Sequence, residues 1–203
     1  MAPVTLVARI LDRTWAYRAW QAPFAARKLA PLLARPDLAA ARRVLDVGCG
    51  PGTNTPLFAH ADYLGIDYNA RYIAHARRRH RRAFIVADVT SLAVPGAQRF
   101  DFVLVNSLLH HLDGTASQRL LVYLAGLLTA DGHVHILDLV LPERVSVAQL
   151  LARWDRGDFP RPLDQWRRMF TTTFEPVVFE PYAITALGVP LWHMVYFKGR
   201  LRR

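Results

Sequence analysis

The stretch Val44-Leu45-Asp46-Val47-Gly48-Cys49-Gly50-Pro51-Gly52-Thr53-Asn54-Thr55 decides the fold. It begins as a short apolar and β-branched run, too short for a buried helix. Three glycines within five residues follow, and then a polar segment that can open a helix. Glycine adopts positive φ angles and leaves no Cβ between the backbone and a ligand. The stretch therefore predicts a strand, a tight loop and a helix, with a loop that a ligand can approach closely.

The spacing of the glycines narrows the class of ligand. A dinucleotide-binding loop of the form G-x-G-x-x-G needs its third glycine at position 53, but Thr53 is there and the glycine is Gly52. A pyrophosphate on this loop would also lie beside the carboxylate of Asp46, which repels an anion and attracts a cation. S-adenosylmethionine carries a sulfonium and an ammonium group, so its charge suits the loop better.

The motif D-V-G-C-G-P-G-T at residues 46–53 resembles motif I of the class I S-adenosylmethionine-dependent methyltransferases. The resemblance implies an α/β fold of the Rossmann-like, doubly wound type. Its seven-stranded sheet is mostly parallel with the last strand antiparallel, and N-terminal helices and a small helical cap accompany it. The implied cofactor is S-adenosyl-L-methionine. The resemblance is strong over residues 44–139 and holds in outline elsewhere.

Length and composition predict a single soluble globular domain. The 203 residues are 52% hydrophobic and 21% charged, which suits one core. The chain has no apolar run near the roughly 18 residues that span a bilayer, and residues 1–10 show no cleavage-type site. Its single cysteine, Cys49, cannot form an intrachain disulfide. We therefore expect a cytoplasmic protein without a transmembrane segment, whose oligomeric state the sequence does not indicate.

The formal net charge of +10 raises the alternative of a nucleic-acid partner. The densest basic run, at residues 77–82, comes at the end of a predicted helix, where cations complement the macrodipole. Aromatic side chains, which could stack on bases, do not interleave with it. The N-P-P-Y type of segment, which holds a flipped base, is missing after the fourth predicted strand. We expect no stable nucleic-acid complex, and an RNA or other nucleic-acid methyltransferase stays the alternative.

Three successive predicted strands each deliver a carboxylate. Asp46 lies in the first strand, Asp67 ends the second at residues 63–67, and Asp88 lies near the end of the third at residues 84–89. Open α/β sheets bind ligands at the carboxyl ends of their strands, where Asp67 can accept both ribose hydroxyls of a nucleoside and Asp88 can accept from an adenine amino group. The predicted cofactor-binding residues are Asp46, Gly48, Cys49, Gly50, Asp67, Tyr68, Asp88, Val89, Asn106 and Ser107.

The fourth predicted strand, residues 100–106, is followed by a segment similar to the N-x-L-H-H-L segment of the family. Methyl transfer is an in-line displacement, so most of its rate comes from orientation and little acid–base machinery is obligatory. A hydroxyl or acidic-carbon acceptor would gain from a base, for which His110, His111 and Asp138 are the candidates. For His111, a hydrogen bond that fixes the loop is an equal alternative.

Two histidines of the fifth predicted strand, His133 and His135, point to one face by the period of two. A metal pair is conceivable there, but a third ligand at a sensible spacing is missing. A core histidine with a hydrogen-bonding partner is the commoner arrangement. We therefore expect no metal site.

The single domain of residues 1–203 is expected to comprise a helical extension (1–40), a cofactor-binding core (44–139), a cap segment (142–161), and a C-terminal helix and hairpin (162–203). A parallel crossover from the fifth to the sixth strand takes one helix, yet a capping box at Ser146 and the stretch 162–170 predict two. The first is predicted to cover the substrate pocket, and Arg161 is expected to line that pocket or its rim. The residues predicted to bind the substrate are Trp154, Arg156, Phe159, Tyr17 and Trp20.

Together these features predict a methyltransferase that acts on an O, N or C atom of a small-molecule or lipid-like acceptor. The apolar and aromatic residues of the cap favour such an acceptor over a nucleic acid. A non-catalytic cofactor-binding protein that kept the fold is a further alternative. The intact glycine loop and the three acids argue against it, because a scaffold has no use for them.

Overall fold

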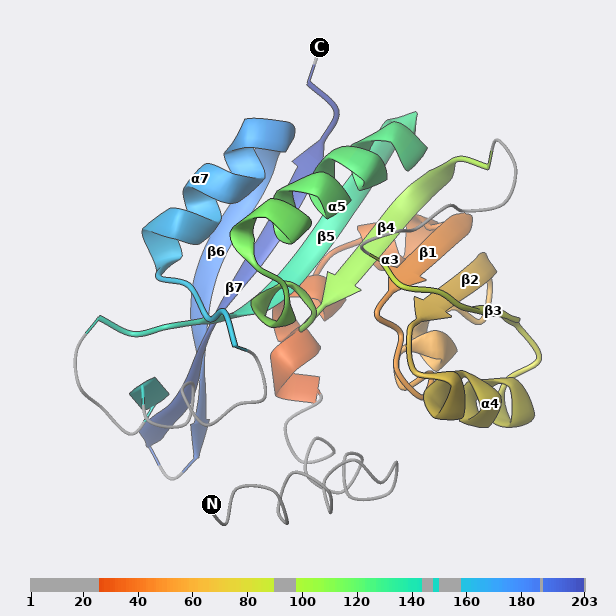
Figure 1. Cartoon of the computed structure of the whole chain (residues 1–203), viewed down its shortest axis with the longest axis horizontal. Helices are drawn as coiled ribbons and strands as arrows, with labels where there is room; N and C mark the ends of the chain where they lie inside the picture. The colour runs from red at the N-terminus through yellow and green to blue at the C-terminus, as the bar shows by residue number, and fades with distance from the viewer. Residues whose placement is uncertain (1–25, 90–97, 144–147, 150–157, 187, 203) are drawn as a thin grey trace.

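The computed structural model describes residues 26–89, 98–143, 148–149, 158–186 and 188–202. Within these ranges a seven-stranded sheet has the order β3-β2-β1-β4-β5-β7-β6 (Figure 1). The strands are β1 (Arg43–Val47), β2 (Asp62–Asp67), β3 (Ala83–Val86), β4 (Phe100–Asn106), β5 (Leu128–Val140), β6 (Glu175–Ala186) and β7 (Val189–Arg200).

Helices and 3₁₀ turns connect these strands. They are α3 (Asp37–Ala40), η1 (Thr55–Phe58), α4 (Ala70–Arg79), η2 (Leu109–His111), α5 (Gly114–Leu127) and α7 (Leu163–Thr173). Residues 26–33 and 148–149 are also helical. In the part of the chain that the structure describes, none of the helices combines the length and apolarity that a membrane span requires.

The direction of the strands confirms the predicted doubly wound sheet. β1 pairs in parallel with β2 on one side and with β4 on the other, and β3 and β5 continue the parallel arrangement outward. β7 is antiparallel to both β5 and β6, as expected for the last strand. The chain thus runs outward from β1 in one direction and then in the other. Such a reversal opens a crevice between the loops that follow β1 and β4, which is where open sheets of this kind bind ligands.

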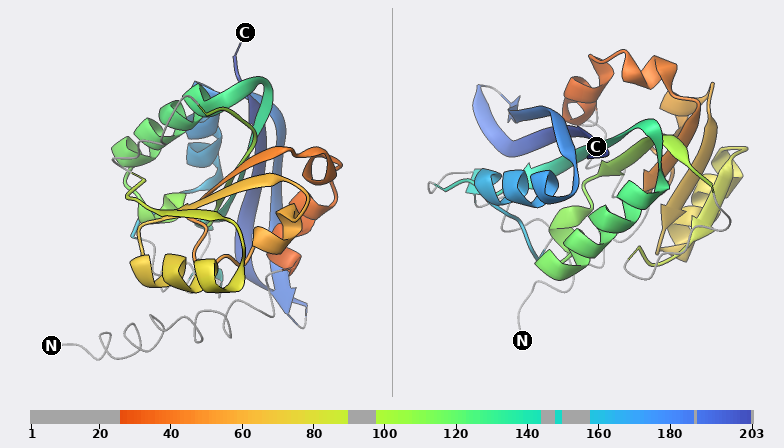
Figure 2. Two further views of the ribbon diagram at one scale, coloured as in Figure 1. Left: turned by 90° about the vertical axis from the view of Figure 1, so that its right-hand side faces the viewer. Right: turned by 90° about the horizontal axis from the view of Figure 1, so that it is seen from above.

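Helices cover both faces of the sheet. Figure 2 shows α5 and α7 on one face and the helical residues 26–33 with α3 on the other. One hydrophobic core lies between the sheet and α5 and α7, and a second joins the opposite face to residues 29–32 and α4. The four residues from Phe102 to Val105 in β4 are all buried, because a parallel strand covered on both sides needs apolar side chains in both directions.

The helix starts follow local capping chemistry. The side chain of Asn69 accepts hydrogen bonds from two backbone N–H groups of α4, which is typical of asparagine at this position. α7 begins directly after Pro162, at the start of the predicted helical stretch 162–170. Residues 115–118 have the T-x-x-Q pattern of a capping box, but α5 is capped by Asp113, which accepts from the backbone N–H of Ala116.

The end of β3 and the start of β5 need comment. β3 ends at Val86, so Asp88 lies beyond the strand rather than within it. β5 begins at Leu128, five residues before His133 of the predicted fifth strand, and includes Gly132. A Cβ at Gly132 would lie 2.8 Å from the carbonyl oxygen of Phe100, so glycine is needed for the close approach of β4 at this irregular register.

The basic run at residues 77–82 begins in the last turn of α4. Arg77 donates a hydrogen bond to the carbonyl of Phe84. Arg82 donates to the carbonyls of Ala59 and Ala61. Two arginines of the run therefore tie α4 and the segment after it to neighbouring loops and strands, which gives them a structural role.

Among the described residues, the sheet is bounded by a short strand at one edge and a proline-containing strand at the other. β3 has four residues, and β6 carries Pro176 and Pro181. Proline lacks the backbone N–H that a β-ladder uses and is tolerated mainly on edge strands. The positions of both prolines are therefore consistent with the place of β6 at the end of the sheet.

His135 is a buried core residue. Its ring stacks on Phe102 with the ring centroids 4.0 Å apart, and its Nδ1 lies 2.9 Å from the hydroxyl of Tyr196. Its Nε2 has no hydrogen-bond partner among the described residues. Burial lowers the pKa of His135 to about 3, because the charged imidazolium would lose its hydration.

The neutral state of His135 predicts a pH-dependent stability. The unfolded chain takes up a proton on this histidine below its ordinary pKa of 6.5, whereas the folded chain resists protonation until about pH 3. Relative to His135→Gln, which cannot be protonated, the wild-type free energy of unfolding should fall by about 1.4 kcal/mol for each unit by which the pH is lowered within this window. Urea unfolding of both proteins at pH 7, 6 and 5 measures the difference. Parallel stability curves would contradict a neutral buried His135.

Candidate active site

The loop after β1 has the backbone that its glycines predict. Gly48, Gly50 and Gly52 have φ angles of 74°, 56° and 81°. A Cβ at Gly52 would lie 2.9 Å from the His80 ring and 3.2 Å from the Cβ of Ala76, so this glycine lets the loop touch α4. A Cβ at Gly50 would meet nothing within 4 Å. Gly50 therefore leaves open space at the loop, where a ligand can approach the backbone.

Asp67, at the end of β2, is joined to the glycine loop. Its Oδ2 accepts a hydrogen bond of 2.9 Å from the backbone N–H of Gly50. Its Oδ1 accepts one of 2.8 Å from the backbone N–H of Asn69. Burial raises the pKa of Asp67, and these two hydrogen bonds oppose the rise. Each carboxylate oxygen has a further lone pair, so the side chain can still accept from the hydroxyls of a nucleoside.

Asp46 lies beneath the loop and has no exposed surface. Its Oδ2 accepts a hydrogen bond of 2.8 Å from the hydroxyl of Tyr63, which in turn accepts one of 3.2 Å from Thr55. Its Oδ1 has no partner among the described residues. Burial raises the pKa of Asp46 to about 7. In this arrangement Asp46 could act on a bound cation through its charge but not by contact.

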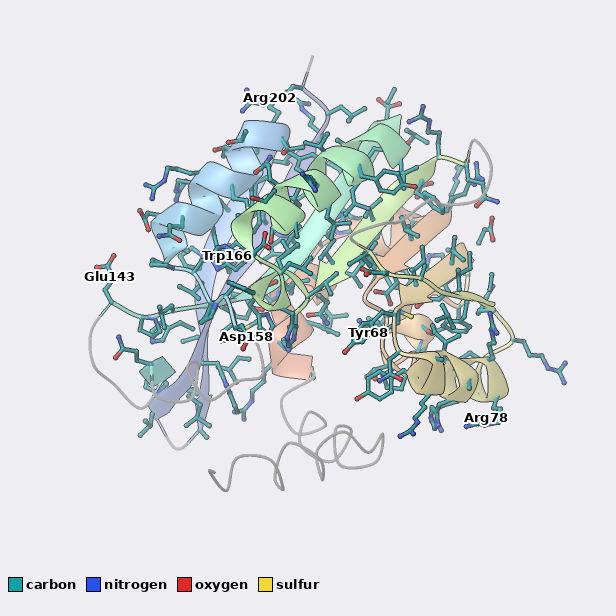
Figure 3. All side chains as sticks on the ribbon, viewed as in Figure 1. Tyr68, Arg78, Glu143, Asp158, Trp166 and Arg202 are labelled. Atoms are coloured by element: carbon teal, nitrogen blue, oxygen red, sulfur yellow. The ribbon has the colours of Figure 1, made fainter. Side chains whose placement is uncertain are left out.

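The other predicted cofactor-binding residues of the first three strand ends differ in exposure. Tyr68 is 74% exposed (Figure 3). Asp88 is also exposed, just beyond the end of β3. Cys49 and Val89 are buried in the two cores on either side of the sheet. Tyr68 and Asp88 can thus meet a ligand directly, whereas Cys49 and Val89 support the loop and the strand end from below.

The chain leaves β4 through a strained residue. Ser107 has a φ of 55°, which is uncommon for a residue with a Cβ, and its backbone N–H donates to the carbonyl of Leu137. Its hydroxyl lies 3.3 Å from Oδ1 of Asn106. The side chain of Leu108 then packs so closely on Gly48 that a Cβ there would lie 3.2 Å from it. Asn106 and Ser107 therefore directly precede the residue that packs on the glycine loop, and their role in cofactor binding stays a prediction.

Asp138 and His110 form a buried pair at the end of β5. The carboxylate of Asp138 accepts from the backbone N–H groups of Leu109 and Leu139 and lies 2.6 Å from Nδ1 of His110. Burial tends to raise the pKa of Asp138, but the charge of His110 and these hydrogen bonds outweigh it and hold the pKa below its ordinary value. An ionised carboxylate only accepts, so Nδ1 of His110 carries the hydrogen and a neutral ring has its lone pair on Nε2.

The structure also brings His111 and Phe159 to this pair. The ring of His111, which is exposed, has its centroid 4.2 Å from that of His110. The backbone N–H of Phe159 donates to the carbonyl of His110, and its side chain is 42% exposed. The predicted substrate-binding residues outside the described part of the chain are Tyr17, Trp20, Trp154 and Arg156. The predicted start of the cap helix at Ser146 also lies outside it.

Arg161 is placed differently from the sequence-based expectation. The sequence put it in the lining or at the rim of the substrate pocket, but the residue is 7% exposed and its guanidinium lies against backbone carbonyls of the turn that carries His110. The chain is rich in arginine, and no local pattern distinguishes this one. Its partner Leu109 lies 52 residues earlier in the chain, so only the tertiary structure reveals the contact.

Among the described residues, no group of three or more His, Cys, Asp or Glu side chains could hold a metal ion. His133 and His135 have ring centroids 6.4 Å apart. The site as described therefore consists of the glycine loop, the acids at the strand ends, and the pair of His110 and Asp138.

Comparison with known proteins identifies relatives. Residues 44–132 match the family model described as methyltransferase domain. Trans-aconitate 2-methyltransferase of Variovorax paradoxus is 30% identical over 175 residues, which are 81% of this chain and 65% of that protein. Its namesake from Delftia acidovorans is 41% identical over 87 residues, or 40% of this chain and 32% of that protein. The N-methyltransferase NodS of Bradyrhizobium japonicum, solved with S-adenosyl-l-homocysteine, has 17% identity and a TM-score of 0.66 over 96% of this chain and 91% of its own.

The likeness to NodS shows the Rossmann-like methyltransferase fold. Residues 44–132 are accordingly similar to a methyltransferase domain, as the glycine loop indicated. The chain spans between 28% and 65% of the length of the first five curated relatives.

The burial of Asp46 predicts that removing its charge stabilises the protein without ligand. The raised pKa means that the carboxyl costs stability progressively as pH rises from 3.8, its ordinary value, to about 7. Asp46→Asn should therefore become more stable than the wild type with rising pH, and the gain should level off above pH 7. Denaturant unfolding between pH 5 and 8 measures it.

The control is Asp62→Asn, because the side chain of Asp62 is 80% exposed and lies at the start of β2. This variant should follow the wild type at every pH. A stability difference for Asp46→Asn that does not change with pH would show that the carboxyl is ionised throughout.

Proposed function

We propose that the protein transfers a methyl group from S-adenosyl-L-methionine to a small-molecule acceptor. The observation that carries the proposal is the hydrogen bond from Gly50 to Asp67. It places a carboxylate with remaining acceptor capacity beside a loop whose glycine faces open space. These features suit a nucleoside, because the acid can accept ribose hydroxyls while the loop leaves room for the rest of the molecule.

The chain's own residues divide the binding of such a cofactor among them. Asp67 would hold the ribose, and the exposed ring of Tyr68 would lie against the adenine. Ser107 and Asn106, across the crevice, would face the methionine part. The bound cofactor supplies a methyl group activated by the positive sulfonium. The protein then contributes mainly by holding the acceptor in line with that methyl and by excluding water.

A small carboxylic acid is the acceptor class that we propose to test first. Two of the relatives are named trans-aconitate 2-methyltransferases. The formal net charge of +10 also favours the approach of an anion. If a carboxylate oxygen attacks the methyl carbon, the carbon–sulfur bond breaks with its electron pair on sulfur, and no proton has to be removed. His110 and His111 would then orient the acceptor, whereas a hydroxyl or acidic-carbon acceptor would use one of them as a base.

Cofactor binding is tested by calorimetric titration with S-adenosylmethionine and with its demethylated product. Both should show one saturable site. Asp67→Ala should weaken the affinity by ~1.5–3 kcal/mol, the usual range for hydrogen bonds to a charged group. Asp62→Asn, an exposed acid near the start of the same strand, is the matched control and should bind normally. Absence of heat with either compound would refute the proposal, and an unchanged constant for Asp67→Ala would refute its role.

The acceptor is tested with cofactor that carries a labelled methyl group. A panel of small dicarboxylic and tricarboxylic acids, trans-aconitate included, should contain at least one compound that becomes labelled. Small amines, phenols and RNA serve as comparison acceptors. Labelling of RNA in preference to every acid would support the nucleic-acid alternative, and labelling of an amine or phenol alone would replace the acid by that class.

A further inference from the structure

Arg161 is bound to the backbone around the turn η2, which carries both histidines. Its Nη1 donates to the carbonyls of Leu109 and Phe159 at 3.0 and 3.2 Å. Its Nη2 donates to the carbonyl of Leu112 at 2.6 Å and lies 3.4 Å from the hydroxyl of Ser117. The guanidinium thus contacts carbonyls at both ends of one short turn. Its several N–H donors have a fixed planar arrangement, which allows it to bind more than one carbonyl at once.

The turn is held from two sides by opposite charges. The carboxylate of Asp138 accepts from the backbone N–H of Leu109 and lies against the ring of His110. The guanidinium of Arg161 donates hydrogen bonds to the carbonyls of Leu109 and Leu112. Helical turns leave N–H groups unpaired at their start and carbonyls unpaired at their end, so an anion and a cation stabilise the two ends respectively.

Both charges are anchored to the same strand. Asp138 belongs to β5, and Arg161 forms a parallel bridge with Val140 at the end of β5 while its carbonyl accepts from the backbone N–H of Leu141. The guanidinium lies over the ring of Trp166, 4.8 Å from its centroid. The indole N–H of Trp166 donates to the carbonyl of Leu139. The position of His110 is thereby tied to the end of β5 through both of its charged neighbours.

We propose that Arg161 is a positioning residue for His110 and His111. It acts through the carbonyls of Leu109 and Leu112, fixes the turn that carries both rings, and leaves the cofactor half of the crevice unaffected. The inference rests on the proposed methyl transfer. The two Nη atoms donate to carbonyls of different residues, so a lysine, which has a single ammonium group, is not equivalent.

The first test compares Arg161→Ala, Arg161→Lys and Arg167→Ala. Arg167 is the matched control because its guanidinium also lies over an aromatic ring, that of Phe179 at 4.0 Å, but on the exposed side of α7. Both Arg161 variants should bind the demethylated cofactor within about twofold of the wild type and lose between about tenfold and a hundredfold in kcat, the scale expected when reacting groups are misplaced. Arg167→Ala should retain full activity.

Chemical rescue separates positioning from plain stability. Millimolar guanidinium should restore part of the activity of Arg161→Ala, because the ion can reoccupy the site over Trp166, whereas ammonium at the same concentration should not. Equal loss of kcat and of cofactor affinity would overturn the proposal. Unchanged kcat in Arg161→Ala, or failure of guanidinium to restore any activity, would also overturn it.

A second measurement does not depend on activity. The Nδ1–H proton of His110 should give a downfield NMR resonance, which His110→Gln identifies by its loss. In Arg161→Lys this resonance should shift or broaden while the signal of the Trp166 indole N–H persists. An unchanged His110 resonance would refute positioning by Arg161. If the wild type methylates no acceptor, the proposed function fails, and this resonance still decides what Arg161 does.

Discussion

The hydrogen bond between Gly50 and Asp67 couples the first two strand ends, and the cofactor half of the crevice depends on it. It forms only because the loop after β1 turns sharply through residues with positive φ, which a side chain would strain. Gly65 adds a further constraint from below, since a Cβ there would lie 2.9 Å from the sulfur of Cys49. The geometry of this region is therefore set by the backbone more than by polar side chains.

Sequence patterns predicted the elements whose causes are local. The glycine loop and the acids at the strand ends follow from short-range chemistry, and the doubly wound, mostly parallel sheet followed from the family resemblance. The unpredicted features depend on contacts between distant segments. Tyr63 of β2 donates to Asp46 of the neighbouring β1, and Arg161 donates to a turn about fifty residues earlier in the chain. Periodicity indicates the face on which a side chain lies but not the group that it meets there.

Asp46 and His135, two buried titratable groups on the same face of the sheet, have opposite effects on the pH dependence of stability. Asp46, Leu104 and His135 stand in register across β1, β4 and β5, on the same face of the sheet. Between pH 3.8 and 6.5 the folded chain keeps a proton on Asp46 and none on His135, whereas unfolding reverses both states. The two contributions to the pH dependence of stability therefore have opposite signs and offset each other. A buried acid and a buried base in one row make the stability of the protein less sensitive to mild acidity than either alone.

The edges of the sheet have a consequence for the behaviour of the protein at high concentration. An exposed strand edge is a template on which another chain can add a strand, and from there aggregates can grow. Four residues of β3 offer too short a ladder for lasting pairing. On β6, Pro176 and Pro181 remove two of the donors that an added strand would need. As far as the structure describes the sheet, both of its edge strands therefore disfavour edge-to-edge aggregation.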